Sequence, residues 1–416
     1  MSVTDFYKDF LKGDKVIWTC FFLLIAISIV EMYSASSTLA FRAKNFNAPI
    51  TRHVMFLLVG FVVAYFTHRS LPYKYIPLLG LFLYVVSIAL LIFVLMIGES
   101  TNDATRWLPI FGFKFQPSEL AKLSTIISCA LFIGRCKGVF TPKRIWIFLG
   151  MVTIPTFLIL LDNLSTAAML FVICLIMLFC AGISLRELWT FISSRGFVGV
   201  VCAVFVIGLT YFLYTGKEVG DVFHRAETWQ NRFIRFYTEV PLDSSFEVTD
   251  YNRQSTHAKI AISNGRYSGL GIGDSEQRDF LPHAFDDFIF AIIVEETGLF
   301  SLLVIALYLG VFSRCLYLIY RCDEPILCYT LLGISLMLLI QAYFHVAVSL
   351  GCVPVTGQPL PIISRGGTSC LVGCLSFGLL LCISRYIYEN PKESSSNGRQ
   401  RVDKSKREDK EVQIEE

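Results

Sequence analysis

The sequence predicts an all-α polytopic membrane protein. Of its 416 residues, 54% are hydrophobic and only 17% are charged, and several apolar runs approach twenty residues. Soluble chains contain about 25% charged residues, and an apolar run of about 20 residues crosses a bilayer as a helix. The formal net charge of +3 argues against a nucleic-acid partner held by a general basic field.

Ten transmembrane helices are expected from the apolar runs. The first run has no small-residue cleavage site, so we expect it to remain as a membrane anchor and not as a signal peptide. The ten runs lie near residues 16–36, 53–68, 75–97, 118–136, 144–161, 164–183, 197–214, 286–318, 327–350 and 366–388.

The distribution of Lys and Arg predicts the orientation. With the N-terminus in the cytoplasm, the inward segments carry twenty of these residues and the short outward loops carry six, which is the bias that sets membrane topology. Both termini are therefore expected inside. Residues 1–14 form a cytoplasmic tail, residues 15–388 a membrane domain, and residues 389–416 a polar tail that we expect to be disordered.

One large periplasmic loop is expected between helices seven and eight, at residues 215–285. Its acidic and basic residues are nearly balanced, which argues against a non-specific anion trap. Residues 226–238 are expected to lie as an amphipathic helix at the membrane interface.

The thirteen cysteines show neither CxxC nor paired Cys/His spacing, and most lie in the apolar runs. We interpret them as small buried apolar residues. The sequence supports neither a disulfide framework nor a structural metal.

Four polar clusters interrupt the apolar pattern at the outward ends of helices, where charge is costly and commonly functional. The first contains Arg106, Glu119 and Lys122. Glu119 and Lys122 are three residues apart and so share one helix face. Either they form an internal ion pair that ties this helix to a neighbour, or Lys122 and Arg106 face an anion.

The second and third clusters contain carboxylates. Asp162 either caps the helix that follows it or belongs to a functional site. Asp286 and Asp287 open the predicted helix 286–318, where the helix dipole favours negative charge. On that helix, Asp287 and Glu295 would lie within about 80° on one face and about 12 Å apart in depth, which is more than a cap requires.

The fourth cluster is the segment 354–369, with three prolines, three glycines and Arg365. Irregular backbone at membrane depth is tolerated only inside protein or along a cavity. Either Arg365 and the free N–H groups of the next helix face an anion, or the segment is a tight re-entrant loop without a ligand. All four clusters share the outward side, which suits an anionic, lipid-linked substrate at the outer leaflet.

Five ordered blocks resemble the SEDS family of bacterial peptidoglycan glycosyltransferases over roughly residues 15–390. The FtsW cell-division type is the most similar branch and the RodA elongation type is second. His257 stands where the family usually has Gln, and Asn163 falls where a Gly-containing Asp-Leu motif is common. The blocks are NDATRW with FQPSELAKLS (102–124), LDNLSTA (161–167), AISNGRYSGLGIGDS (261–275), LPHAFDDFIFAIIVEETG (281–298) and GQPLPIISRGGTS (357–369).

The resemblance implies polymerisation of lipid II, the undecaprenyl-pyrophosphate-linked disaccharide-pentapeptide. Asp286 and Asp287 compete for the role of the family's outer-loop aspartate, and the x-D-F-I-F pattern selects Asp287 as general base, alone or with Mg or Mn. No organic cofactor is expected. The substrate-binding residues would be Arg106, Lys122, Arg365, Glu119, Glu295 and Asp162, with Glu119 positioning Lys122.

The resemblance also implies a class B penicillin-binding transpeptidase as partner, other divisome membrane proteins, and a septal location in the bacterial inner membrane. Two other interpretations remain open. A lipid II flippase or secondary transporter would also use discontinuous helices and intramembrane charge. A non-catalytic scaffold would leave the four polar clusters unexplained.

Overall fold

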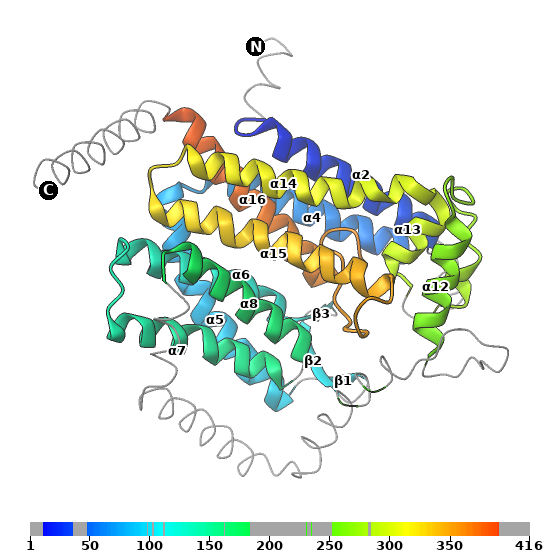
Figure 1. The fold of residues 1–416 in the computed structure, drawn as a ribbon, viewed down its shortest axis with the longest axis horizontal. Coiled ribbons are helices and arrows are strands. Elements are labelled where there is room, and N and C mark those ends of the chain that lie inside the picture. The colour runs from blue at the N-terminus through cyan, green and yellow to red at the C-terminus, as the bar shows by residue number, and fades with distance from the viewer. Residues whose placement is uncertain are drawn as a thin grey trace, which may run out of the picture.

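The structure, a computed structural model, describes residues 11–35, 48–97, 99–101, 104–110, 113–161, 163–183, 230, 234, 252–281 and 284–390. In these parts of the chain, long helices run side by side as one bundle (Figure 1). The predicted helix 197–214, the C-terminal tail and most of the predicted periplasmic loop lie outside the described residues, as do most of the N-terminal tail and of the amphipathic stretch 226–238.

The predicted apolar runs correspond to helices wherever the structure describes them, so the all-α membrane class is confirmed. Seven helical spans within the described residues are long and apolar enough to cross a bilayer. Helix α8 has 17 residues, and α6 carries three charged residues within its length. The bundle helices are α2 (Lys15–Ala35), α4 (Ala48–Ser70), α5 (Ile76–Ile97), α6 (Pro117–Cys136), α7 (Pro142–Leu160), α8 (Leu164–Cys180), α13 (Ile289–Thr297), α14 (Leu302–Tyr320), α15 (Pro325–Ser349) and α16 (Gly367–Glu389).

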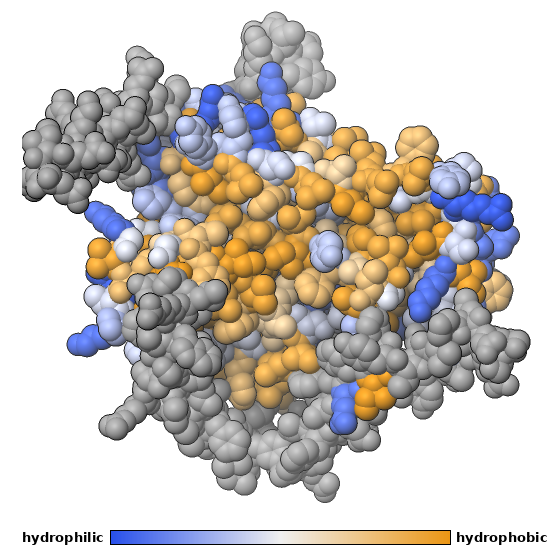
Figure 2. Space-filling view, in the orientation of Figure 1, coloured by the Kyte–Doolittle hydropathy of each residue, from blue (hydrophilic) through white to orange (hydrophobic). Residues whose placement is uncertain are grey.

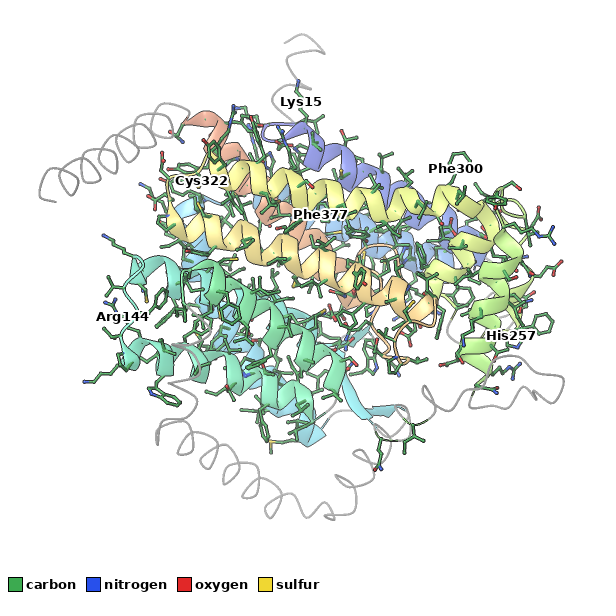
Figure 3. The ribbon with its side chains drawn as sticks, in the orientation of Figure 1. Lys15, Arg144, His257, Phe300, Cys322 and Phe377 are labelled. Carbon is green, nitrogen blue, oxygen red and sulfur yellow. The ribbon has the colours of Figure 1, made fainter. Side chains whose placement is uncertain are left out.

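The first and last described bundle helices meet at one end of the bundle, which we call the terminal end. There the Asp14 carboxylate, just before α2, pairs with Arg314 of α14 at 2.6 Å and accepts a hydrogen bond from the Tyr388 hydroxyl of α16 at 2.9 Å. Arg144 and Cys322 lie at this end, and His257 and Phe300 lie toward the opposite one (Figure 3). We call that opposite end the loop end.

Hydrophobic side chains cover the broad face of the bundle between its two ends, and hydrophilic ones gather toward the ends (Figure 2). Phe66 in α4 and Phe82 and Val85 in α5 are also more than half exposed. Helices α15 and α16 are instead mostly buried, because they run through the centre of the bundle. An apolar belt around a packed interior is the arrangement expected for a chain whose solvent is lipid.

The loop end contains elements that the apolar pattern did not predict. A small antiparallel sheet of order β1-β2-β3 consists of β1 (Glu99–Thr101), β2 (Ala104–Ile110) and β3 (Phe113–Phe115). Helix α12 (Arg253–Gly265) stands beside α13 (Figure 1), and η2 (Gln277–Asp279) follows it. A further 3-10 turn, η1 (Tyr73–Tyr75), precedes α5 at the terminal end.

The predicted span 286–318 corresponds to one helical span, Ile289–Tyr320, which is interrupted near its start. Helix α13 ends at Thr297, the turn η3 (Gly298–Ser301) follows, and α14 continues from Leu302. The segment 269–271 ends α13 by hydrogen bonding to its last turn: the N–H of Leu270 donates to the Glu295 carbonyl at 2.9 Å and the N–H of Gly271 to the Glu296 carbonyl at 3.0 Å.

The start of that helix also differs from the prediction. Helix α13 begins at Ile289 after a turn that contains Asp286 and Asp287. Asp287 therefore precedes the helix, and the expectation that it shares a helical face with Glu295 is wrong.

Candidate active site

The segment 350–366 between α15 and α16 is an irregular, largely buried loop at the loop end. Its carbonyl groups are bound by polar side chains of the surrounding helices. His345 Nδ1 lies 2.8 Å from the Gln358 carbonyl, and Gln341 Nε2 donates to the Pro359 carbonyl at 3.0 Å. The sequence predicted irregular backbone in this segment, which we call the re-entrant loop. Side chains supply hydrogen bonds to carbonyl groups that no regular element satisfies.

The two aspartates of the third cluster belong to the same assembly. In the turn that contains them, the Asp286 carbonyl accepts from the Ser364 hydroxyl at 2.7 Å, and the Phe285 carbonyl accepts from the Arg365 N–H at 2.9 Å. A Cβ on Gly357 would lie 3.5 Å from Asp287 Oδ2, so the Asp287 carboxylate faces the loop. The turn 284–287 and the loop 357–365 are thus bound to each other directly.

Asp287 and Arg365 are both half-buried. Within the described residues the Arg365 side chain has no ion pair. The hydrogen bonds between the turn and the loop thus bring together the segments that contain Asp287 and Arg365, from two predicted clusters more than seventy positions apart in sequence. Asp286 is half-buried as well, so burial alone does not decide between the two aspartates.

Glu119 and Lys122 form a buried ion pair on α6. Lys122 Nζ lies 2.8 Å from Glu119 Oε1, and only 1% of the Lys122 side chain is exposed. The same ammonium donates to Gln341 Oε1 at 3.3 Å, and Gln341 in turn binds the Pro359 carbonyl. The ion pair that the sequence left as an alternative is present, and it connects α6 through α15 to the re-entrant loop.

The start of α16 also contacts the region of the first cluster. The Thr368 hydroxyl accepts from the Gln116 N–H at 3.1 Å and donates to the Lys114 carbonyl at 3.2 Å. Arg106 lies in β2, next to the strand that contains Lys114. The backbone of the first cluster is thereby held beside the fourth, and the substrate role of Arg106 stays a prediction.

Glu295 is placed differently. It is fully buried, its Oε1 accepts from Asn264 Nδ2 at 2.9 Å, and its Oε2 accepts from the Ser275 hydroxyl and from the Gln277 N–H at 3.2 Å. Both oxygens thus bind the α12–η2 region, which assigns Glu295 a visible structural role, whereas its predicted contact with substrate stays a prediction.

Asp162 lies outside the described residues, but its neighbour Asn163 shows how α8 begins. Asn163 Oδ1 accepts from the Ser165 N–H at 3.1 Å and the Thr166 N–H at 3.2 Å, so Asn163 is the N-cap. The hydroxyl of Thr166 accepts a hydrogen bond from Gln358 Nε2 in the re-entrant loop. The second cluster therefore also contacts the fourth.

A metal site is not formed by the described residues. None of the groups that they bring together contains three or more His, Cys, Asp or Glu side chains able to hold an ion. The twelve cysteines within the described ranges are free thiols. The predicted Mg or Mn at Asp287 stays a prediction, and no chemistry below depends on it.

Several neutral polar residues of this site were missed in the sequence. Buried Ser28, His53, His345 and Gln341 lie in apolar helices, and Tyr308 donates its hydroxyl to the Pro361 carbonyl. Intramembrane His and Gln are unusual enough to have been a signal. A criterion based on charge alone does not select these neutral residues.

Comparison with known proteins agrees with this architecture. The family model FtsW/RodA/SpoVE, described as "Cell cycle protein", matches residues 14–389, so the chain belongs to this family, which is the SEDS family of the motifs. A probable peptidoglycan glycosyltransferase FtsW from Geobacter sp. (strain M18) is 29% identical over 89% of this chain and 94% of its own length. A protein of the same name from Coxiella burnetii is 30% identical over 91% of this chain and 97% of its own length.

Two solved structures share the fold. A chain from a peptidoglycan synthase complex, studied for its coordination of polymerization and crosslinking, has a TM-score of 0.65 at 22% identity and covers 91% of this chain and 99% of its own. The rod shape determining protein RodA of Thermus thermophilus has a TM-score of 0.62 at 22% identity, with the same coverage. The chain is thus a multi-pass membrane protein of the FtsW/RodA type.

Proposed function

We propose that this protein is a peptidoglycan glycosyltransferase that polymerises lipid II at the outer leaflet of the bacterial inner membrane. The observation that carries the proposal is the direct bonding of the turn 284–287 to the loop 357–365, which sets the Asp287 carboxylate and the Arg365 guanidinium in one assembly. Curated relatives that match nearly the whole chain are named for this activity.

Asp287 acts as the general base. A sugar hydroxyl attacks the anomeric carbon of a lipid-pyrophosphate donor, and its proton passes to the Asp287 carboxylate as the new C–O bond forms. The bond from that carbon to the pyrophosphate oxygen breaks in the same displacement and inverts the anomeric centre. The position of Asp287 ahead of α13 suits this role, because it lies half-buried beside the loop and not inside a helix.

Arg365 binds the pyrophosphate leaving group. The pyrophosphate is negatively charged in the bound donor and gains charge in the transition state, and a guanidinium without an ion pair among the described residues is suited to bind it in both through paired N–H donors. Lys122 has another task in the conformation described here: with Glu119 and Gln341 it supports the loop that contains Arg365. Arg106, in the neighbouring sheet, is proposed as a second pyrophosphate contact.

The cellular setting is proposed from the same relatives. The FtsW names favour septal synthesis in division over elongation, and the likeness to a chain of a peptidoglycan synthase complex favours a class B penicillin-binding transpeptidase as partner. The basic loops that the sequence predicts on the cytoplasmic side favour both termini, and with them the terminal end, inside the cell. The loop end then faces the periplasm, where the substrate headgroup is.

The proposal is tested with purified full-length protein and lipid II. Asp287→Ala should abolish glycan-strand formation, because the attacking hydroxyl loses its base, and a loss of at least about a hundredfold is expected. Asp286→Ala is the matched control, since it removes the adjacent carboxylate from the same turn, and it should retain activity. Strand length is read on gels, and folding by thermal unfolding.

Three results would contradict the proposal. Loss of activity in Asp286→Ala with activity kept in Asp287→Ala would move the base to Asp286. Unchanged polymerisation in both variants would remove the acid–base role from this turn. If wild-type protein moved fluorescent lipid across a vesicle membrane and formed no polymer, the protein would be a transporter instead. Transporters also contain broken helices such as α13–η3–α14.

A further inference from the structure

Ser28 and His53 form a buried polar pair behind the re-entrant loop. Ser28 in α2 is fully buried and His53 in α4 is 4% exposed. The Ser28 hydroxyl lies 2.8 Å from His53 Nε2 and donates to the Ile362 carbonyl at 2.8 Å. A hydroxyl has one hydrogen, so if it is given to the carbonyl, His53 Nε2 carries a hydrogen and donates it to Ser28.

The carbonyl that this pair binds belongs to a strained residue. Ile362 has φ of 68°, is fully buried and is β-branched. The left-handed region costs an ordinary L-residue about 1–2 kcal/mol and persists only where surrounding contacts impose it. The contact with Ser28, supported by His53, is one of those that impose it.

Arg365 follows this strained residue by three positions. Its backbone N–H binds the Phe285 carbonyl at 2.9 Å, in the same loop whose Ile362 carbonyl accepts from Ser28. No ion pair of its own side chain holds it within the described ranges. The position of the guanidinium therefore depends on the backbone of the loop, and that backbone depends on the pair of Ser28 and His53.

We infer that His53, acting through Ser28, is a positioning residue for Arg365: the hydrogen bond from Nε2 keeps Ser28 aimed at the strained Ile362 carbonyl, and so keeps the guanidinium where it meets the pyrophosphate of the substrate. This inference rests on the function proposed above. It adds two helices, α2 and α4, that the sequence clusters did not connect with the site.

The test compares variants at position 53 in purified full-length protein with lipid II. His53→Leu removes the donor and should raise KM by about tenfold with a smaller change in kcat, because a displaced guanidinium weakens substrate binding first. His53→Gln places an amide nitrogen near the position of Nε2 and should restore KM to within about threefold of wild type. Ser28→Ala, a smaller truncation, should reproduce the effect of His53→Leu.

A double-mutant cycle separates positioning from general structure. In an Arg365→Ala background, His53→Leu should produce no further rise in KM, because the group that it positions is absent. A purely structural role would add its cost in both backgrounds. An additive result, or equal impairment of His53→Leu and His53→Gln, would overturn the inference.

A readout without turnover distinguishes this inference from the proposed function. Mass spectrometry can follow the rate at which phenylglyoxal modifies Arg365. This rate should rise in His53→Leu and return to the wild-type value in His53→Gln. Modification of the exposed Arg321 at the terminal end should stay constant. If Arg365 responds in this way but no variant polymerises lipid II, the proposed function fails and the positioning role stands. If wild-type protein polymerises and neither KM nor Arg365 reactivity changes in His53→Leu, the positioning role is wrong.

Discussion

Glu295 and Glu31 are both buried carboxylates, and they differ in how their oxygens are satisfied. Both oxygens of Glu295 accept hydrogen bonds from the α12–η2 region. Glu31 in α2 is 3% exposed, and its Oε2 has no hydrogen-bond partner among the described residues. Glu31 also interacts electrostatically with Glu296, whose Oε2 likewise has none there. Burial beside a second carboxyl group makes ionisation of either one costly, and this cost destabilises the fold.

Replacing Glu31 by Gln should therefore stabilise the protein. The amide keeps the side-chain volume, cannot ionise beside Glu296 and provides a donor for it, so the free energy of unfolding should rise by about 1–3 kcal/mol. Glu295→Gln is the matched control and should lower the same quantity, because an amide cannot accept from all the donors around it. Equilibrium unfolding in mixed micelles measures both, and a less stable Glu31→Gln variant would show that the pair is not repulsive.

The break between α13 and α14 depends on glycine at two contact points. Gly298 has φ of 57°, and a Cβ there would lie 2.5 Å from both the Gly269 nitrogen and the Tyr267 carbonyl oxygen. Gly269 is equally close to its neighbours, since a Cβ added there would lie 2.1 Å from the Glu296 carbonyl oxygen. The 269–271 segment therefore approaches the end of α13 closely enough to replace its helical hydrogen bonds, and the turn that contains Asp287 is held at the other end of the same short helix.

Gly298→Ala should disturb this break and lower both stability and polymerisation. The added methyl group meets backbone atoms, which do not move aside as a flexible side chain does. Gly138→Ala is the matched control, because Gly138 also has positive φ, 79°, but nothing lies within 4 Å of its Cβ. It should cost only the backbone strain of about 1–2 kcal/mol. Thermal unfolding of the two variants, compared side by side, measures the difference, and equal melting temperatures would show that the close contact is unimportant.

Across the whole molecule, two polar assemblies connect helices that are distant in sequence. At the loop end, the re-entrant loop is bound by α2, α14, α15 and the turn 284–287. At the terminal end, fully buried Asp14 joins α14 and α16. Between the two ends the helices pack mainly through apolar side chains, with a few hydrogen bonds between helices such as that from the Tyr84 hydroxyl to the Met151 carbonyl.

Arg314→Ala should weaken the terminal end. It leaves the buried Asp14 carboxylate without its cation, and the expected loss of unfolding free energy is about 1–3 kcal/mol. Arg321→Ala, which removes an exposed arginine that lies over the Tyr317 ring, should have little effect on stability. Unfolding in mixed micelles tests the pair, with polymerisation expected to persist in Arg321→Ala. Equal stability of the two variants would mean that Asp14 does not need its ion pair.

The sequence predicted the membrane class and, within the described residues, the helices of the bundle, because crossing lipid requires long apolar runs that are visible without any tertiary contact. It also selected the charged residues proposed for the site, since charge in such runs is rare. It did not predict the strands at residues 99–115, whose hydrogen bonds form between short segments with weak local preference. It also missed His53, Ser28, Gln341 and His345, because each acts only through a partner far away in the chain.

The sequence alone therefore determined the features that depend on composition. These are the multi-pass helical membrane class and the polar groups at the ends of particular helices. Only the tertiary structure decided how those groups combine. It showed that Asp287 precedes a helix instead of lying on one, that Lys122 is enclosed in an ion pair, and that Glu295 binds the region that breaks its own helix. The physical reason is that burial in lipid depends on local hydrophobicity, whereas a hydrogen bond depends on which distant atoms the packing brings within about 3 Å.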